Sequence, residues 1–172
     1  DKILLNTLLY DNPLLVKELS NIYGKANIVG CIDFIMNKNE HNINVKVNQG
    51  TKLINYDLYE WIQIVSKLEI GEILLQSIDK DGTGNGLFNS LNNSELSNIN
   101  LPIILMGGIG NYEHILEGFK KKNVNAIATA NILNFIGDSF LNTRNLLHEK
   151  KVELPSWDLN TFDKLENIFN AK

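Results

Sequence analysis

Short apolar segments alternate with amphipathic segments along the chain. The segments between the apolar runs carry apolar residues at helical spacing, as in Leu15, Leu19 and Ile22. Continuous apolar strands that alternate with amphipathic helices predict a parallel sheet covered by helices, so the expected fold class is α/β. The five predicted strands lie in 2–7, 28–33, 73–78, 102–105 and 125–130.

Local signals mark where the predicted helices begin and end. Asn12 before Pro13 predicts a capped helix start, and Gly24 predicts its end. Asp57 followed three residues later by Glu60 resembles a capping box for a helix that continues through position 68. Further helices are expected near 88–96, from 110 through 122, near 138–150 and over 162–169.

The stretch 34–55 has a different pattern. Ile43, Val45 and Val47 alternate with polar residues, and a turn-like segment follows at 48–50. Period-two alternation next to a turn predicts a β-hairpin. We interpret it as a β-excursion carried on a surface loop.

Polar residues follow each of the five predicted strands. In parallel α/β folds, ligands and catalytic groups gather where strands end and helices begin. One polar strand end would be unremarkable, whereas five at the same edge predict a site. The residues concerned are Asn6 and Thr7, Asp33, 79–83, Gly107 and Gly108, and 129–131.

The glycine-rich loop at 107–110 has two readings. Its backbone N–H groups could bind an anion at the start of the following helix, or it could simply make a tight turn. The spacing is not that of a dinucleotide-binding loop. Ala130 and Asn131, after the neighbouring strand, would complete an anion site built from two loops.

Carboxylates at two strand ends are the candidates for acid–base chemistry. Asp33 follows apolar residues, so burial could raise its pKa and suit it to proton transfer; alternatively it caps a loop. Asp79 and Asp81 share a loop in which Gly82 and Gly84 allow the backbone to fold around a ligand. These carboxylates could also bind Mg²⁺, but no spaced ligand set accompanies them. Neither a metal site nor an organic cofactor is therefore predicted.

The other reactive side chains have less distinctive positions. Cys31 shares the strand face of Asp33 and is expected to be buried filler, because no histidine at a strand end could activate it. His114 and His148 fall in predicted helices away from strand ends, and His41 falls in the excursion. All three are expected to be surface residues.

Composition excludes several classes of partner. Sixteen basic and 20 acidic residues give a net charge of -4, which disfavours nucleic-acid binding. No apolar run approaches the roughly 18 residues that a membrane helix needs. A single cysteine cannot form an internal disulfide, which suits a cytoplasmic location.

The segment Gly-Glu-Ile-Leu-Leu-Gln-Ser-Ile-Asp-Lys-Asp-Gly-Thr at 71–83 carries a specific resemblance. It resembles the cyclase subunit of imidazole glycerol phosphate synthase, the HisF family. The resemblance continues in order and spacing from Lys2, Asn6 and Thr7 to Gly107 and Gly108, and it covers residues 1–150. Residues 151–172 match less clearly and are expected to form a C-terminal tail with a short helix.

This resemblance implies a (β/α)8 TIM barrel of which the chain holds strands 4–8. Members of the family take ammonia from a glutaminase partner and use it on a bisphosphorylated ribulosyl aminoimidazole-carboxamide substrate. Cyclisation and cleavage then release imidazole glycerol phosphate and an aminoimidazole carboxamide ribotide in histidine biosynthesis.

The resemblance also implies roles for individual residues. Asp33 matches a catalytic acid–base carboxylate, and Lys2 and Glu72 match charged residues that gate ammonia at the opposite end of the barrel. A Lys–Glu pair there could equally be a salt bridge without further function. The residues that match substrate and phosphate contacts are Asn6, Thr7, Asp81, Gly82, Thr83, Gly107, Gly108, Ala130 and Asn131.

Departures from the family pattern keep two alternatives open. Met106, Gln76 and Asn131 differ from the usual residues near the phosphate-binding end. That pattern fits a relative that installs an acetamidino group on a bacterial surface sugar, with a nucleotide sugar in place of the ribulosyl substrate. A non-catalytic half-barrel that binds or assembles with a partner is the third possibility.

The chain is also shorter than the fold it resembles. It has 172 residues, against roughly 250 for a βα barrel, and the match starts at the family's fourth strand. The first-strand catalytic Asp and the third-strand phosphate loop are therefore expected elsewhere. Because five strands cannot close a barrel, the missing N-terminal portion should be supplied in cis or in trans.

Overall fold

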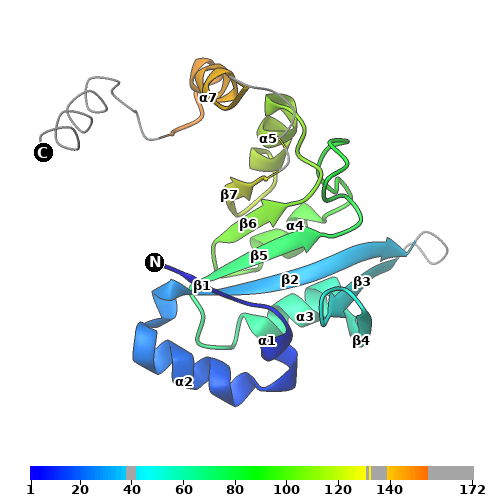
Figure 1. Ribbon diagram of the computed structural model, residues 1–172, viewed down its shortest axis with the longest axis vertical. Coiled ribbons are helices and arrows are strands. Elements are labelled where there is room, and N and C mark those ends of the chain that lie inside the picture. The colour runs from blue at the N-terminus through cyan, green and yellow to red at the C-terminus, as the bar shows by residue number, and fades with distance from the viewer. Residues whose placement is uncertain (38–41, 131, 133–138, 155–172) are drawn as a thin grey trace, which may run out of the picture.

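The structure is a computed structural model that describes residues 1–37, 42–130, 132 and 139–154. Strands and helices alternate along most of this length (Figure 1). The strands are β1 (Ile3–Leu5), β2 (Ile28–Asn37), β3 (Asn42–Val47), β4 (Lys52–Asp57), β5 (Glu72–Ser77), β6 (Ile103–Met106) and β7 (Val124–Ala128). The helices are α1 (Thr7–Asp11), α2 (Pro13–Tyr23), the 3₁₀ turn η1 (Lys25–Asn27), α3 (Leu58–Val65), α4 (Asn93–Ser97), α5 (Tyr112–Phe119) and α7 (Ser139–Glu149).

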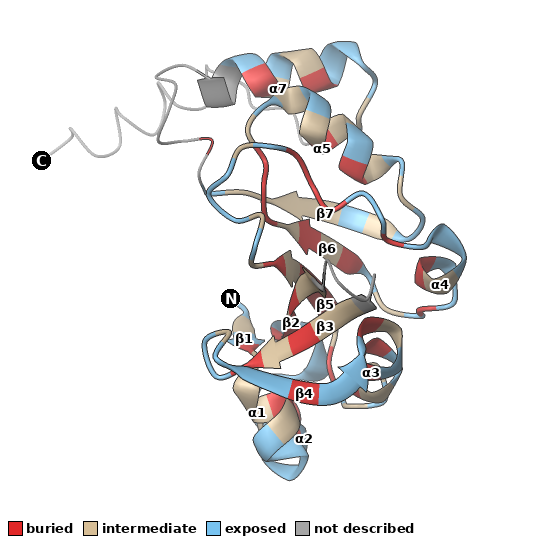
Figure 2. Cartoon of the chain, turned by 90° about the vertical axis from the view of Figure 1, so that its right-hand side faces the viewer, coloured by how far each residue is buried: buried red, intermediate tan, exposed pale blue. Residues whose placement is uncertain are grey.

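All seven strands belong to one sheet with the order β4-β3-β2-β5-β6-β7, and β1 also pairs with β2. The pairs β1–β2, β2–β5, β5–β6 and β6–β7 are parallel. The five predicted strands are thus the five parallel strands, which confirms the α/β fold expected from the alternation. The helices lie on one side of the sheet (Figures 1 and 2).

The long strand β2 organises one end of the sheet. Its first residues, from Ile28 to Gly30, pair with β1, whereas Asp33 to Asn37 pair with β3 in the antiparallel direction. The predicted hairpin is therefore present, but its placement on a surface loop is wrong. Val45 and Val47 are buried, because the apolar side of the hairpin packs into the same core as the parallel strands.

The main core lies between the sheet and the helices. It contains the alternate strand residues that face the helices, such as Ile32, Phe34 and Leu75, together with Leu58 and Ile62 of α3. Figure 2 shows this buried layer along the sheet and on the inward sides of the helices. The period of two in the strands and the helical period in α3 bring these apolar side chains to one interface.

The predicted helix boundaries rest on observed capping contacts. The Asn12 side chain accepts a hydrogen bond from the backbone N–H of Leu15, and Pro13 opens α2. Gly24 ends that helix with a positive φ of 84°. Asp57 and Glu60 form a complete capping box at the start of α3. The signals at both ends of α2 and at the start of α3 are therefore confirmed, whereas α3 ends at Val65 and not at the predicted position 68.

The other side of the sheet is only partly covered. A second, smaller apolar cluster holds Val29, Cys31 and Leu74, with Ile104 and Met106 packed against it. Leu4 of β1 is 58% exposed. The sheet is open, and among the described residues no strand pairs with the outer edge of β7. Such an open, curved arrangement of parallel strands is what one part of a barrel would form.

None of the helices in the described ranges combines the length and the apolar character that a membrane-crossing helix requires.

Candidate functional site

The parallel register brings the predicted polar strand ends to one edge of the sheet. Asp33 pairs with Gln76, Gln76 pairs with Met106, and Met106 pairs with Ala128. Asn6 follows directly after β1, which pairs with the start of β2. β2 does not end at Asp33 as the sequence predicts, because it continues to Asn37 as the antiparallel partner of β3. Asp33 nevertheless lies level with the carboxyl ends of the neighbouring parallel strands, and together they form a continuous rim.

Asp33 lies on the less covered side of this rim and is half-buried. Burial raises the pKa of its carboxyl group above the ordinary value of 3.8, while hydrogen bonds from Cys31 and Asn6 act in the opposite direction. A carboxyl group whose charged form is disfavoured by burial can hold a proton nearer neutral pH. Asp33 therefore has the environment of a general acid or base.

Cys31 supports Asp33 from two residues earlier on the same strand. Its Sγ lies 3.6 Å from Asp33 Oδ1 and 3.9 Å from Gln76 Oε1. Burial, with the nearby Asp33 charge as the next cause, raises the pKa of the thiol from 9.0 to about 12. Cys31 is buried, as predicted, and its thiol stays protonated at neutral pH, so it can donate to Asp33 but is a poor nucleophile.

Asn6 and Thr7 join the end of β1 to neighbouring elements. The Asn6 side-chain amide donates to the carbonyl of Cys31 over 3.1 Å. The Thr7 hydroxyl accepts from the backbone N–H of Asn48 at 2.9 Å and lies 3.3 Å from Asn6 Oδ1. Both side chains are held in place at the rim beside β2.

The loop after β5 carries Asp81, Gly82 and Thr83. The Gln76 amide lies 3.4 Å from Asp81 Oδ2, and the Thr83 hydroxyl donates to the carbonyl of Lys80 at 2.7 Å. Gly82 has a φ of 75°, which a glycine adopts without strain. A hollow of about 410 Å³ opens beside this loop, lined by Ile35, Met36, Asp79, Lys80, Thr83 and Asn85.

Gly107 and Gly108 turn the chain sharply after β6, with φ values of 106° and 87°. A Cβ atom on Gly107 would lie 2.4 Å from the carbonyl oxygen of Ser77, and one on Gly108 would lie 2.1 Å from that of Gly86. Only glycine fits at either position. The tight turn predicted here is therefore present, and it also leaves the backbone close to the rim.

His114 contradicts the expectation that it is a surface residue away from strand ends. It is half-buried, and its Nδ1 accepts a hydrogen bond from the backbone N–H of Gly110 at 3.1 Å. The reason is its spacing: four residues after Gly110, the first turn of α5 brings the ring back over the glycine loop.

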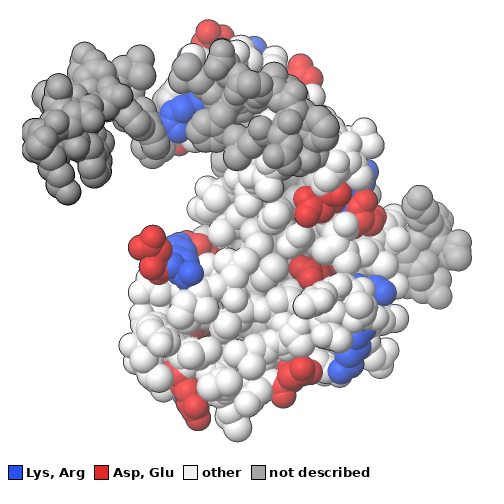
Figure 3. Space-filling view, viewed as in Figure 1, with Lys and Arg blue, Asp and Glu red and all other residues white. Residues whose placement is uncertain are grey.

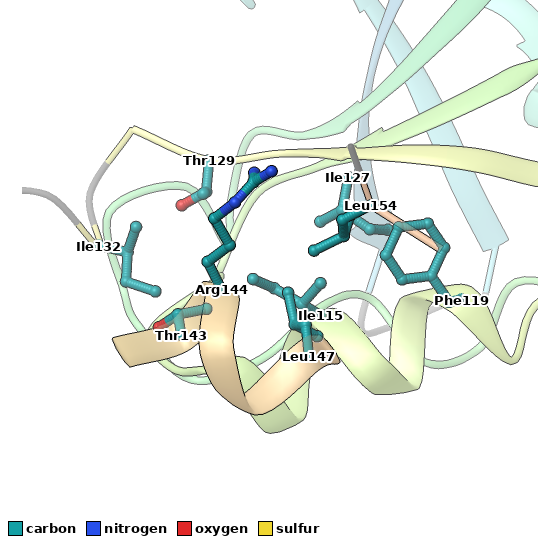
Figure 4. A pocket seen from close by; sticks show the side chains of 9 residues that line it. All are labelled: Ile115, Phe119, Ile127, Thr129, Ile132, Thr143, Arg144, Leu147 and Leu154. Carbon is teal, nitrogen blue, oxygen red and sulfur yellow. The ribbon is translucent and has the colours of Figure 1, made fainter. Parts of the chain in front are cut away.

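The last strand end contributes less to the described site. Ala130 is exposed just after β7, and Asn131 lies outside the described residues. A separate cavity of about 160 Å³ lies between α5, β7 and α7. Figure 4 shows that its lining is mostly aliphatic and that Arg144 extends from α7 toward Thr129. Asp33 does not line this cavity, whereas Thr129, one of the predicted polar strand-end residues, does.

Lys2 and Glu72 form an ion pair at the opposite, amino-terminal end of the sheet. Figure 3 shows basic and acidic atoms side by side near the N-terminus, with further acidic groups toward the carboxyl ends of the strands. Gln76 lies four positions after Glu72 in β5, which corresponds to about 13 Å along a strand. The two charged regions thus lie at the two ends of the same strands.

Two residues of the site were not proposed from sequence as parts of it. Gln76 points to the same face of β5 as Leu74. The alternation along β5 is therefore a signal that could have placed Gln76 beside Asp33. His114 could have been found from its four-residue spacing to Gly110. Among the described residues, no group of three His, Cys, Asp or Glu side chains is placed to hold a metal ion.

Comparisons with known proteins show the family to which the chain belongs. The family described as Histidine biosynthesis protein matches residues 1–137. The chain belongs to this family. It is 37% identical over 161 residues to the putative imidazole glycerol phosphate synthase subunit hisF2 of Parasynechococcus marenigrum, an alignment that covers 92% of this chain and 59% of that protein.

Other members of the family match the chain with similar identity and coverage. The imidazole glycerol phosphate synthase subunit HisF of Leptospira biflexa is 34% identical over 154 residues, covering 90% of this chain and 60% of that protein. The HisF subunit of Chlorobium phaeobacteroides is 32% identical over 154 residues, covering 90% of this chain and 61% of that protein. The resemblance found in the sequence is thereby confirmed. The chain spans about 60% of the length of the curated relatives it matches.

Proposed function

We propose that this chain provides strands 4–8 of a HisF-type, ammonia-dependent cyclase and lyase. The observation that carries the proposal is Asp33, a half-buried carboxyl group with a raised pKa at the carboxyl ends of the parallel strands. Proton transfer by such a group suits the closure of an imidazole ring, in which ammonia loses protons and a carbonyl oxygen leaves as water.

Other rim residues would bind the substrate. The loop at 107–108 and Ala130 with Asn131 would hold one phosphate through backbone N–H groups. Asn6 and Thr7 would contact the substrate from the end of β1, and Asp81, Gly82 and Thr83 would close over it. The hollow beside Thr83 gives the loop after β5 room for a ligand.

Ammonia would enter from the opposite end of the strands. The Lys2–Glu72 pair would control that entrance, and a glutaminase subunit would dock there to supply ammonia. The side of the sheet away from the helices, with the apolar cluster of Val29, Cys31 and Leu74, would then line the path toward Asp33. An apolar lining suits the passage of neutral ammonia more than that of ammonium.

A closed barrel requires more strands than this chain provides. The open sheet, the exposed Leu4 and the length of the relatives all support a missing portion supplied in cis or in trans. That portion would bring the second acid–base carboxylate, so the 172-residue chain alone is expected to be inactive. The lone buried Cys31 is compatible with a reducing cytoplasm.

The test is turnover of the ribulosyl aminoimidazole-carboxamide substrate by the full-length protein with ammonium salts. We expect imidazole glycerol phosphate to form, and we expect glutamine to replace ammonia only when the glutaminase subunit is added. A folded full-length protein without turnover would contradict the histidine role. Turnover by the 172-residue chain alone would contradict the need for the missing strands.

A second candidate is an amidotransfer reaction on a nucleotide sugar. Met106 ends β6 immediately before the glycine turn and packs in the small apolar cluster, where its thioether offers no strong hydrogen bond to a phosphate. This favours a less polar substrate group at that point. Ammonia-dependent formation of an acetamidino group on a nucleotide sugar, without turnover of the ribulosyl substrate, would distinguish this role. A protein inactive with both substrates would favour a non-catalytic half-barrel.

A further inference from the structure

The two glycine-rich loops at the rim are interlocked through their backbones. The backbone N–H of Gly86, in the loop after β5, donates to the carbonyl of Gly108, in the loop after β6, over 2.7 Å. A Cβ on Gly108 would lie 2.1 Å from the Gly86 oxygen, so the contact has no space for a side chain. The conformation of either loop therefore depends on that of the other.

The same two loops approach each other closely a second time, at Gly84 and Gly110. A Cβ on Gly110 would lie 2.4 Å from the carbonyl oxygen of Gly84 and 2.9 Å from its Cα. Glycines Gly84 and Gly86 both have positive φ values, which lets the first loop follow the second closely. The two loops therefore approach each other closely at two points.

His114 contacts both loops at once. Its Nδ1 accepts the hydrogen bond from the Gly110 N–H, and a Cβ on Gly86 would meet its Nε2 and Cδ2 at 3.4 Å. The acceptor role of Nδ1 means that the ring proton sits on Nε2 in this arrangement. The backbone of His114 is itself fixed, because its N–H donates to the Asn111 side chain at the cap of α5.

We propose that His114 is a positioning residue that fastens the two glycine loops in their ligand-binding conformation. The step to substrate binding rests on the proposed function, in which Gly107 and Gly108 meet a phosphate group. Without the Nδ1 acceptor, the Gly110 N–H loses its partner and the loop gains alternative conformations. Ligand affinity then falls because part of the binding energy is used to order the loop, whereas proton transfer at Asp33 is unchanged.

The substitutions separate the acceptor from the ring. His114→Phe keeps a ring against Gly86 but has no acceptor for Gly110, and His114→Asn places an acceptor oxygen close to the position of Nδ1. In the full-length protein, we expect His114→Phe to raise KM about tenfold, the equivalent of one lost hydrogen bond, with kcat within about twofold. His114→Asn should restore most of the loss. His148→Phe, at an exposed position on α7, is the matched control and should change neither constant.

A readout without turnover keeps this inference separate from the proposed function. Amide hydrogen exchange at Gly110 should accelerate about tenfold in His114→Phe and stay near the native rate in His114→Asn and His148→Phe. In a titration with inorganic phosphate, His114→Phe should bind more weakly than the wild type, whereas His114→Asn and His148→Phe should bind with near-native affinity. Altered exchange and phosphate affinity in a protein without turnover would contradict the proposed reaction and support the role of His114.

The opposite result would overturn the inference. Native exchange at Gly110 and native phosphate affinity in His114→Phe would show that the loops hold their conformation without the side chain. A fall in kcat at constant KM would likewise contradict a positioning role. If His114→Phe does not fold, His114→Leu provides the acceptor-free variant for the same comparison.

Discussion

The two sides of the sheet differ in what their side chains do, and β2 shows the difference within two consecutive residues. Phe34 points to the helical side, is 1% exposed and packs edge-to-face with Phe88 at 5.4 Å between ring centroids. Asp33 points to the other side, is half-buried and lies beside the Cys31 thiol. Adjacent positions on one strand thus serve different purposes, because successive side chains point to opposite faces.

This difference predicts that one side of the sheet contributes mainly to stability and the other to the proposed chemistry. The helical side removes a large apolar surface from water, which is the dominant favourable contribution to folding. The other side keeps polar groups at one end and a small apolar cluster in the middle, and burial there raises the pKa of Asp33 and of Cys31. Substitutions on the two sides should therefore affect different measurements.

The largest effect is expected from Asp33→Asn, measured as kcat of the full-length protein with ammonia. Loss of an acid–base carboxyl group should lower kcat by about 1,000-fold. The amide keeps an acceptor for Cys31, so the free energy of unfolding from urea denaturation should change by less than about 1 kcal/mol. Retained activity would show that Asp33 has no part in the mechanism, and the expected difference in role between Asp33 and Phe34 would be wrong.

The converse effect is expected from Phe34→Ala. Truncating this buried ring leaves a cavity and should lower the free energy of unfolding by about 3–5 kcal/mol. The fraction that remains folded should keep a near-native KM. Phe119→Ala, at a partly buried position on α5, is a matched control that should cost less. An unfolding free energy close to that of the wild type would show that the helical side is not the main source of stability.

Cys31→Ala should change the response of stability to alkaline pH. The unfolded thiol ionises near its ordinary pKa of 9.0, whereas the folded thiol keeps its proton until about pH 12. Above pH 9 the native state therefore binds more protons than the unfolded state, and stability falls as pH rises. Between pH 9 and about pH 11, the wild type should lose about 2 kcal/mol more than Cys31→Ala.

Urea denaturation at several pH values checks this expectation. The difference between the two proteins in the slope of unfolding free energy against pH isolates Cys31 from the other groups that titrate in this range. Identical slopes for the two proteins would mean that the thiol is not held in its protonated form. Cys31 would then behave like an exposed cysteine and would not donate a hydrogen bond that supports Asp33.

The smallest effect on stability is expected from Glu72→Gln at the far end of the same strands. Exposed ion pairs contribute less than about 1 kcal/mol, and salt reduces that contribution further. If the pair with Lys2 controls ammonia entry, glutamine-dependent turnover should change while turnover with free ammonia does not. Equal changes in both activities would leave the pair with a structural role only.

Much of this fold could be predicted from local patterns. The five parallel strands, the cap of α2 at Asn12 and the capping box of α3 depend on residues that are close in sequence, so the signals are local. The polar strand ends could also be assigned to one edge, because parallel strands share a direction. The resemblance through 71–83 identified the family from residues that lie in β5 and its following loop.

The errors arose where contacts are distant in sequence. The hairpin of β3 and β4 was assigned to the surface, since its alternation shows that one side is apolar but not what that side contacts. His114 was assigned to the surface because its own helix gives no indication that the loop from Gly84 to Gly86 packs beneath the ring. The roles of the individual site residues stay predictions.

Local patterns in the amino-acid sequence are enough to predict the alternation of strands and helices, the edge at which polar residues gather and the family to which the chain belongs. Each of these depends on side-chain periodicity or on residues within a short segment. The contacts of Cys31 with Asp33 and Gln76, and of His114 with two glycine loops, depend instead on how the elements pack in the folded chain. Burial, the resulting pKa shifts and backbone-to-backbone contacts depend on which strands lie side by side, and strand pairing is a property of the whole sheet.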